Sequence, residues 1–450
     1  MNIVIAGAGE VGSHLAKLLV EGNHEITVIE YDEDRLRRVS ELGDLLTING
    51  HPTSFEILER ANVDKADLFI AVSTSKEQDV NIISAAFAKQ MGAKKVIARI
   101  NNEEYLNPER GTVFASMGID YLFYPEKNAM HEILDLLKTT GSTEYMSFSN
   151  GKLQLIAYKL EEGAPVIDKM LKDISVIDQE INYRVVAIAR GGKTIIPDST
   201  EELKVDDTVF IISVRKGTDK IISYTGKSNI DVKNVLILGG TRIGEMLASA
   251  LEEEITKVKL IDANRERCEQ LAEKLSDTLV IHGDIRNTEL LIEEDVKNVD
   301  VVVAVTGSSE TNILSCILAK QLGVKKTIAE IEDIDYIPLA ENMGVDTVIN
   351  KKLLTVSRIF RFTMGSNVQS VRLLNGSIAE VLEFIVKADS PVTKAPIKDL
   401  HFPKDAIIGG IIRGNSSFIA VGDKQIKAYD RVVVVTMPSA ITEVNRFFQN

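Results

Sequence analysis

The sequence contains only two cysteines, Cys268 and Cys316, among its 450 residues. Both lie in segments whose spacing of apolar residues is typical of amphipathic helices. Two cysteines cannot supply a disulfide scaffold or a cysteine-rich metal cluster, and such a chain suits a reducing compartment. We therefore expect no metal site.

Long apolar runs are also missing. A run such as residues 301–305 falls far short of the roughly 18 residues needed to cross a bilayer. The first residues, MNIVI, form a strand pattern and lack the basic start and cleavage site of a signal peptide. We expect a cytoplasmic protein without direct membrane insertion, so that any role at a membrane requires a partner.

The chain has no excess of basic residues: 66 acidic residues stand against 52 basic ones, a formal net charge of -14. Binding to a nucleic-acid backbone requires a basic footprint, and no basic helix-turn-helix segment is present. We therefore expect no nucleic-acid partner. The hydrophobic fraction of 44% with 26% charged residues is ordinary for globular proteins, which predicts a folded chain throughout.

What the sequence does contain is an internal duplication. The segment NIVIAGAGEVG, which ends at Gly12, matches NVLILGGTRIG, which ends at Gly244. Glu30 and Asp262 are separated by the same number of residues as these two glycines. Further along, AKQMGAKKVIARI matches AKQLGVKKTIAEI. The chain therefore contains two copies of one unit.

Each copy begins with short β-rich runs that alternate with helical periodicity. In the first copy we predict strands up to residue 7 and at 26–30, 45–48, 68–72 and 96–100, and helices up to residue 20 and at 34–42 and 80–91. This βαβ pattern predicts an α/β fold in which each copy has a doubly wound, parallel-sheet, Rossmann-type domain.

After residue 124 the pattern changes. A helical stretch runs to residue 138, and β-rich segments follow at 153–158, 185–190 and 208–214; they recur at 381–386, 407–413 and 431–436. A small α+β domain is therefore predicted after each Rossmann-type domain. The predicted order is N-domain 1 (residues 1–124), C-domain 1 (141–226), N-domain 2 (232–350) and C-domain 2 (368–450).

The segment Gly7-Ala8-Gly9-Glu10-Val11-Gly12 has the form G-x-G-x-x-G and lies directly between a predicted strand and a predicted helix. Gly7 is expected to make the tight turn, Gly9 to let the backbone approach a diphosphate, and Gly12 to let the helix pack on the strand. The helix N-terminus supplies free N–H groups and a positive dipole for an anion. We call this segment the first fingerprint.

Glu30 ends the second predicted strand, where a carboxylate accepts hydrogen bonds from both ribose hydroxyls of an adenosine and repels a 2′-phosphate. NAD(H) is therefore favoured over NADP as the cofactor, with ATP or ADP as alternative ligands. The competing interpretation is that the glycines serve packing alone and that Glu30 is a solvated strand end. The matching acid Asp262 favours the nucleotide interpretation.

Ligands of such sheets bind beyond the carboxyl ends of the strands, which adds further candidates. These are Ser73, Thr74 and Arg99 in the first copy, and Asp284 and Thr306 in the second. Arg99 is placed to reach a phosphate, although a surface salt bridge explains it equally well, and Glu330 occupies its position in the second copy. Asp284 is placed to meet an adenine amino group, and a helix N-cap is the alternative.

The second fingerprint, Gly239-Gly240-Thr241-Arg242-Ile243-Gly244, has threonine in place of the middle glycine. A β-branched side chain at this point obstructs close approach of the backbone to a diphosphate. The Thr241 hydroxyl and the Arg242 guanidinium are instead suited to a terminal phosphate. We therefore expect two unequal sites, with Asp262 as the ribose acceptor of the second.

Residues for catalysis are not apparent. A dehydrogenase needs a positioned acid or base and a substrate anchor near the nicotinamide. The histidines do not recur at matching positions with acidic partners: His14, His24, His51, His131, His282 and His401. No H-E-x-x-H motif or nucleophile elbow occurs. We predict a regulator without catalytic residues; the alternative is an NAD-dependent oxidoreductase with tandem Rossmann folds.

The first fingerprint with Glu30, the segment AVST followed by NIISAAFAK, and the ARI that ends at Ile100 resemble RCK domains, the regulators of potassium conductance. Two N-plus-C copies in one chain resemble the tandem-RCK regulatory subunits of bacterial potassium-uptake systems. The resemblance implies a homo-oligomer, a tetramer, peripheral on the inner face of the cell membrane beneath a potassium-translocating subunit whose gate responds to NAD(H) or adenine nucleotides. The family's nucleotide residues correspond to residues 7–12, Glu30, Thr74 and Arg99, and to Gly239, Gly240, Gly244 and Asp262.

Overall fold

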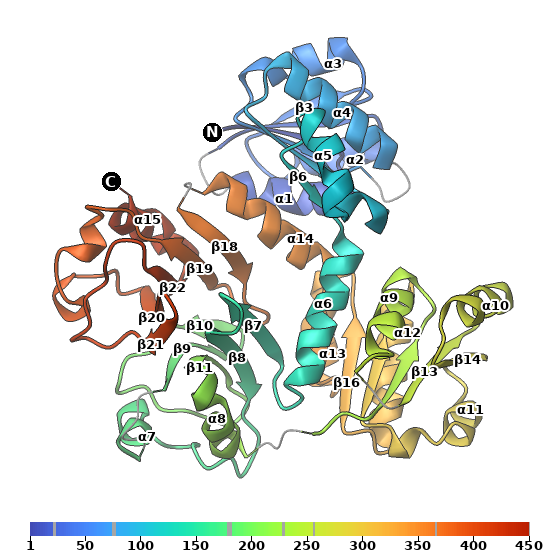
Figure 1. Ribbon diagram of the computed structural model, residues 1–450, viewed down its shortest axis with the longest axis vertical. Helices are drawn as coiled ribbons and strands as arrows, with labels where there is room; N and C mark the ends of the chain where they lie inside the picture. The colour runs from blue at the N-terminus through green and yellow to red at the C-terminus, as the bar shows by residue number, and fades with distance from the viewer. Residues whose placement is uncertain are drawn as a thin grey trace. The chain divides into compact units, whose positions relative to one another are not determined.

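The structure is a computed structural model that describes residues 1–20, 24–73, 78–177, 182–226, 230–254, 257–364 and 367–449 (Figure 1). Its internal contacts divide the chain into two units. The first consists of Met1–Asn128 with Lys351–Met364, and the second of Ala129–Asn350 with Gly365–Asn450. A segment of the second repeat is therefore part of the unit that contains N-domain 1.

N-domain 1 is built on a six-stranded parallel sheet in the order β3-β2-β1-β4-β5-β6. Its strands are β1 (Asn2–Ala6), β2 (Glu25–Glu30), β3 (Leu46–Asn49), β4 (Leu68–Ala71), β5 (Lys95–Arg99) and β6 (Tyr121–Phe123). All four residues of β4 are buried, as expected for a parallel strand with helices on both faces. This strand order is that of a doubly wound nucleotide-binding sheet.

Helices cover both faces of this sheet. They are α1 (Glu10–Val20), α2 (Glu33–Ser40), α3 (Phe55–Arg60), α4 (Gln78–Met91), α5 (Pro108–Ser116) and the start of α6 (Pro125–Lys138). Successive residues of β1 point to opposite faces. Ile5 packs with Leu15 of α1 on one face, and Val4 packs with Ala88 of α4 on the other.

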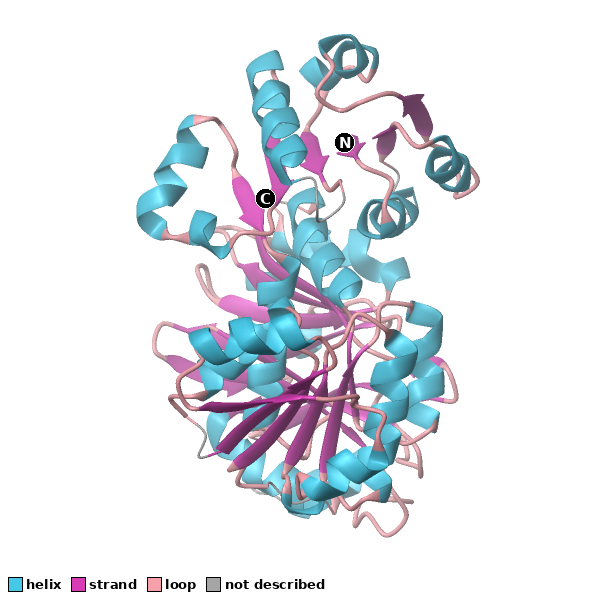
Figure 2. Ribbon diagram, turned by 90° about the vertical axis from the view of Figure 1, so that its right-hand side faces the viewer, coloured by secondary structure: helices cyan, strands magenta, loops and turns pink. Residues whose placement is uncertain are grey.

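N-domain 2 repeats this arrangement, with strand order β14-β13-β12-β15-β16-β17. Figure 2, which looks from the side of this domain, shows helices on both faces of the strands. The elements are β12 (Asn234–Leu238), α9 (Arg242–Leu251), β13 (Lys257–Asp262), α10 (Arg265–Lys274), β14 (Thr278–His282), α11 (Thr288–Glu293), β15 (Val301–Ala304), α12 (Ser309–Gln321), β16 (Lys326–Glu330), α13 (Ile337–Asn342) and β17 (Thr347–Ile349). The prediction of two doubly wound parallel sheets is confirmed.

The C-domains are five-stranded antiparallel sheets with helices, in the orders β10-β9-β11-β8-β7 and β18-β19-β22-β20-β21. C-domain 1 contains β7 (Glu144–Phe148), β8 (Leu153–Lys159), α7 (Leu171–Ile177), β9 (Tyr183–Arg190), β10 (Lys193–Ile195), β11 (Thr208–Val214) and α8 (Thr218–Thr225). C-domain 2 contains β18 (Val368–Leu373), β19 (Glu380–Ile385), β20 (Ala406–Arg413), β21 (Ser416–Ile419), β22 (Arg431–Thr436) and α15 (Ile441–Phe448). The central strands were predicted; β7, β10, β18 and β21 were not.

The two C-domain sheets pack face to face in one apolar core that includes Phe210 and Ile212 of β11 and Val433 of β22. Gly409 and Gly410 lie inside β20, where glycine normally weakens a strand. A Cβ at Gly409 would lie 2.2 Å from Ile212 Cδ1. These glycines therefore allow the two sheets to approach each other closely.

A buried ionic cluster ties α6 to both C-domains. Arg372 of β18 forms an ion pair with Glu132 of α6, and its Nε lies 3.5 Å from Glu144 Oε1 of β7. Burial raises the pKa of Glu144 to about 7, while Arg372 opposes this rise. Lys326 of β16 adds a further contact with α6 and the segment after it, because its Nζ donates to the carbonyls of Leu136 in α6 (3.2 Å) and of Ser142 (3.0 Å).

Candidate functional site

The three glycines of the first fingerprint have different environments. Gly7 has φ 110°, and a Cβ there would lie 2.6 Å from Ser73 N. A Cβ at Gly12 would lie 1.9 Å from Gly7 O. Gly7 and Gly12 are therefore required by the fold itself. A Cβ at Gly9 would meet nothing within 4 Å, so neither packing nor backbone strain explains this glycine, and the open space beside it fits an approaching ligand.

Glu30 lies against the fingerprint loop. The residue is 3% exposed, and Oε2 accepts from Ala8 N at 2.7 Å. Oε1 accepts from Tyr31 N at 3.0 Å and Asp32 N at 3.1 Å. Glu30 is thus an acceptor held at the glycine turn. A solvated strand end, the competing interpretation, does not describe this buried carboxylate.

The ends of β4 and β5 meet beside the loop through Asn81 of α4, which is 1% exposed. Its Oδ1 accepts from Ser73 N at 2.8 Å, and its Nδ2 donates to Arg99 O at 3.2 Å. Asn81 was missed by the sequence reasoning. The available signal was its match with Asn312 in the second repeat, inside a helix that is otherwise mostly apolar. Thr74, also predicted, lies outside the described residues.

Arg99 forms an ion pair with Glu126 of α6 at 3.4 Å. The alternative interpretation, a salt bridge, is therefore present, but the two side chains are only 15% and 11% exposed, so the pair does not lie on the surface. Nε of Arg99 is buried without a hydrogen-bond partner among the described residues. The guanidinium therefore retains donor capacity at the carboxyl edge of the sheet.

The outer glycines of the second fingerprint, Gly239 and Gly244, have the same roles as Gly7 and Gly12 in the first. Gly239 has φ 113°, and a Cβ at Gly244 would lie 2.1 Å from Gly239 O. Thr241 is the N-cap of α9; its hydroxyl donates to Val305 O at 2.7 Å and accepts from Gly244 N at 3.4 Å. The single hydroxyl proton is therefore directed at the protein, and a phosphate contact of the predicted kind requires the side chain to rotate.

Asp262 corresponds to Glu30 in structure as well as in sequence. Its Oδ2 accepts from Gly240 N at 2.6 Å, and its Oδ1 from Asn264 N at 2.7 Å. Arg267 of α10 covers the same turn, since its Nε donates to Gly240 O at 2.6 Å and it pairs with Glu245. At the matching turn of the first repeat Ser13 Oγ donates to Ala8 O, and Nε of Arg35, at the position of Arg267, lies 3.8 Å from Asp32 Oδ2.

The remaining predicted residues differ in their surroundings. Thr306 N donates to Asn312 Oδ1 at 2.9 Å, and Asn312 Nδ2 donates to Glu330 O at 2.7 Å, so the Asn81 arrangement recurs. Asp284 is exposed, and the side chain of Arg286 lowers its pKa to about 2. The N-cap of α11 is Asn287 rather than Asp284, so that alternative is wrong. Arg242 is exposed in the first turn of α9.

Val11 and Ile243 were also predicted as contacts. Their side chains are 7% and 2% exposed and belong to the apolar cores. Only their backbone N–H groups, in the first turns of α1 and α9, are available to an anion.

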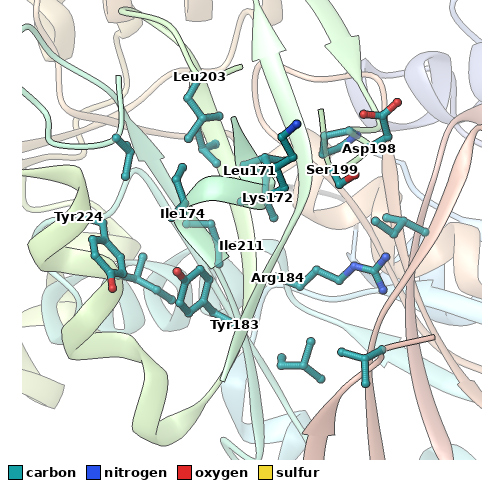
Figure 3. Close-up of a pocket in the computed structure, with 18 of the residues that line it drawn as sticks. Leu171, Lys172, Ile174, Tyr183, Arg184, Asp198, Ser199, Leu203, Ile211 and Tyr224 are labelled. Atoms are coloured by element: carbon teal, nitrogen blue, oxygen red, sulfur yellow. The ribbon is translucent and has the colours of Figure 1, made fainter. Parts of the chain in front are cut away.

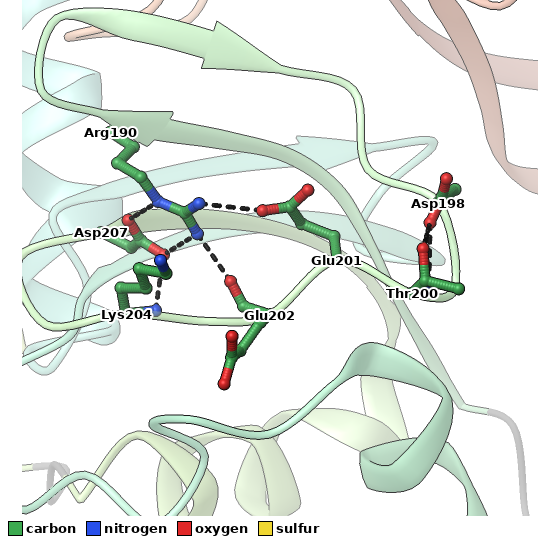
Figure 4. A network of polar contacts seen from close by, with 7 residues as sticks. All are labelled: Arg190, Asp198, Thr200, Glu201, Glu202, Lys204 and Asp207. Carbon is green, nitrogen blue, oxygen red and sulfur yellow. Dashed lines mark hydrogen bonds and ion pairs between the residues drawn. The ribbon is translucent and has the colours of Figure 1, made fainter.

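In each C-domain a buried aspartate before the last strand holds an arginine at the hairpin; Figure 4 shows this pair and its neighbours in C-domain 1. Arg190 Nε lies 2.7 Å from Asp207 Oδ1, and Asp207 is fully buried. Arg413 Nη2 lies 2.7 Å from Asp430 Oδ2. Each arginine is therefore held at two points by an aspartate of its own domain, a contact that serves the fold.

C-domain 1 also contains a cavity of about 430 Å³ with a mostly apolar lining (Figure 3). Leu171 and Ile174 line it from α7, and Ile407 from C-domain 2. Arg184 Nη1 donates to Ile408 O at 3.0 Å and also to Ala420 O. Burial lowers the pKa of this guanidinium. No sequence pattern pointed to this cavity, because its lining comes from separate segments of both C-domains.

Among the described residues, no group of three or more histidine, cysteine, aspartate or glutamate side chains is arranged to hold a metal ion. Within the same described segments, no helix has the length and apolar character needed to cross a bilayer.

Comparison with known proteins gives consistent matches along the chain. Residues 3–125 and 235–351 match the TrkA-N domain family, and residues 155–226 and 381–449 match the TrkA-C domain family. A Trk system potassium uptake protein TrkA homolog of Archaeoglobus fulgidus is 36% identical over 450 residues, covering 100% of both chains. The Trk system potassium uptake protein TrkA of Vibrio alginolyticus is 32% identical over 455 residues, covering 100% of this chain and 99% of that one.

The fold is also found among solved structures. The crystal structure of the GsuK RCK domain has a TM-score of 0.60 at 16% identity and covers 99% of this chain and 94% of that one. The GsuK channel bound to NAD has a TM-score of 0.59 at 16% identity and covers 99% of this chain and 78% of that one. At this identity the likeness concerns the fold, and it confirms the predicted RCK architecture.

Proposed function

The chain belongs to the TrkA family of Trk system potassium uptake proteins, and from this premise we propose that it is a nucleotide-sensing regulatory subunit. In this proposal the chain binds NAD(H), with ADP or ATP as alternative ligands, and gates a potassium-translocating membrane partner. It acts as a homo-oligomer, a tetramer, on the cytoplasmic face of the membrane.

The observation that carries the proposal is the geometry of the first fingerprint. Gly9 faces open space, while Glu30 stands 2.7 Å from Ala8 N on the same turn. A diphosphate that follows Gly9 to the N-terminus of α1 meets free N–H groups and a positive dipole. Its ribose then reaches the Glu30 carboxylate, which repels a 2′-phosphate, so NAD(H) is favoured over NADP.

The two sites are proposed to be unequal. Thr241 adds a side chain where Gly9 has none, and Arg267 covers the neighbouring peptide. Loss of one close backbone contact costs about 1 to 3 kcal/mol, which is roughly 5- to 150-fold in affinity. The first site is therefore proposed to bind the dinucleotide and the second to bind it more weakly.

Regulation requires that the nucleotide bind two conformations of the assembly with different affinity, because equal affinity shifts no population. The names of the relatives supply the transported ion, potassium. The absence of matched catalytic histidines in the sequence favours this sensing role over hydride transfer.

Titration calorimetry of the full chain with NADH tests the proposal. Glu30→Ala removes the ribose acceptor of the first site and should abolish the tighter binding event, because hydrogen bonds to a charged acceptor contribute about 1.5 to 3 kcal/mol each. Asp262→Ala is the matched control in the second repeat and should leave that event intact. Equal loss in both variants, or no loss in Glu30→Ala, would refute the assignment.

The competing oxidoreductase role has its own test. If the purified protein oxidised NADH with a panel of small metabolites at about 1 per second or faster, the low end of typical enzymes, the regulatory proposal would be abandoned.

A further inference from the structure

Helix α14 (Lys351–Phe360) belongs to the second repeat by sequence but packs in the unit of N-domain 1. Its Val356 and Ile359 are fully buried in the core that contains Leu15 and Leu19 of α1. Figure 1 shows α14 beside α1. The helix follows β17 of N-domain 2 along the chain and precedes β18 of C-domain 2. A helix with both ends in the second repeat therefore completes N-domain 1.

The first turn of α14 carries a lysine that reaches the first fingerprint. Lys352 Nζ lies 2.8 Å from Glu10 Oε2. Glu10 is the fourth fingerprint residue and the first residue of α1. The lysine side chain is only 15% exposed, whereas that of Glu10 is 66% exposed. The ammonium group is thus held at the N-terminus of α1, where the proposed diphosphate binds.

The negative charge of Glu10 opposes phosphate binding at the first fingerprint, and the positive charge of Lys352 offsets it. A carboxylate on the turn that receives a diphosphate opposes binding by like-charge repulsion. An ammonium group offsets that charge, and its three N–H donors allow it to bind a carboxylate and a phosphate oxygen at the same time. His14, one turn further along α1, does not add a second cation at neutral pH, because burial, Lys17 and Lys352 lower its pKa.

Between the two repeats, the charge at the Glu10 position of the fingerprint and the charge on the helix that follows the sheet change together. Arg242 occupies the position of Glu10 in the second fingerprint. Glu126 is the third residue after β6, as Lys352 is the third residue after β17. The fingerprint residue and the first-turn residue of the linker helix that follows it, α6 or α14, are both acidic in the first repeat (Glu10 and Glu126) and both basic in the second (Arg242 and Lys352). The charge on the second linker helix is therefore complementary to the first fingerprint.

We propose that Lys352 is a phosphate-binding residue of the first nucleotide site, supplied by the second repeat. The inference rests on the proposed function. The ligand class is a nucleoside diphosphate or dinucleotide, whose phosphate shares the Lys352 ammonium with Glu10. Binding then holds α14 on α1 and so transmits the occupancy of N-domain 1 to the chain segments on either side of α14.

Calorimetry on the full chain, in an Asp262→Ala background that removes the second site, tests this inference with NADH, ADP and adenosine as probes. Lys352→Gln should weaken NADH and ADP about tenfold or more and leave adenosine within twofold, because adenosine has no phosphate. Lys351→Gln, on the same helical turn, is the matched control and should leave all three affinities unchanged. Adding Glu10→Gln to Lys352→Gln should recover part of the lost affinity.

A purely structural role for Lys352 predicts a different result. Lys352→Gln would then lower the melting temperature without changing the affinity for NADH or ADP, or would weaken adenosine as much as ADP, and either outcome overturns the inference. If the background protein with Lys352 intact binds none of the three probes while Glu30→Ala also changes nothing in the wild-type protein, the proposed function itself fails. The two failures are therefore distinguishable.

Discussion

Replacing Gly9 with alanine separates a glycine required by a ligand from one required by the fold. A Cβ at Gly9 meets no atom within 4 Å, and its φ lies outside the left-handed region. The substitution should therefore leave the free energy of unfolding unchanged or raise it by about 0.4 to 1 kcal/mol, since alanine reduces the entropy of the unfolded chain. Gly12→Ala is the control, because its Cβ would lie 1.9 Å from Gly7 O.

The effect on binding should have the opposite sign. If a diphosphate approaches the backbone at Gly9, the added methyl group displaces it and costs about 1 to 3 kcal/mol, or roughly 5- to 150-fold in affinity. Gly9→Thr, which copies Thr241 of the second repeat, should weaken NADH further. Urea unfolding without nucleotide and NADH calorimetry provide the two measurements. A Gly9→Ala protein that is destabilised without nucleotide, or that binds NADH as the wild type does, would refute the reasoning.

Two further predictions concern buried charge. Burial raises the pKa of Glu380 from 4.5 to about 7, so the folded protein binds the proton more tightly, and the free energy of unfolding should fall as pH rises from 4.5 to 7. Glu380→Gln should stabilise the chain by about 3 kcal/mol at pH 8 and by little at pH 4.5; an equal effect at both pH values in urea unfolding would contradict this. Arg372→Met removes the cation from between Glu132 and Glu144 and should destabilise the chain by about 3 to 5 kcal/mol at pH 8. Glu144→Gln in the same protein should restore part of that loss, and no recovery would show that the carboxylates are not the cause.

The fold was largely predictable because its signals are local. The fingerprints, the β-rich runs and the acid that ends the second strand are each contained in a short stretch of sequence. Because the chain is duplicated, each of these patterns occurs twice. The edge strands of the C-domain sheets were missed; β10, for example, has only three residues and no buried face to impose alternation. β10 forms a strand because it hydrogen-bonds to β9, and not because of a pattern in its own sequence.

The site was predictable where one repeat unit supplies it and not where distant segments meet. Glu30 and the fingerprint are joined within a βαβ unit, so their spacing in the sequence implies their contact. The contact of Lys352 with Glu10 depends on where α14 packs. Helical periodicity shows that α14 has an apolar face, but it does not say which core that face joins.

Potassium uptake tests the central claim most directly. In a strain lacking this gene and any paralogue, wild-type protein should restore growth and potassium uptake at low external potassium. The Glu30→Ala variant, expressed to the same level, should give uptake that no longer responds to the cellular NADH level, because the proposed ribose acceptor of the first site is lost. Normal uptake in the deletion strain, or wild-type nucleotide dependence in the Glu30→Ala strain, would contradict the account.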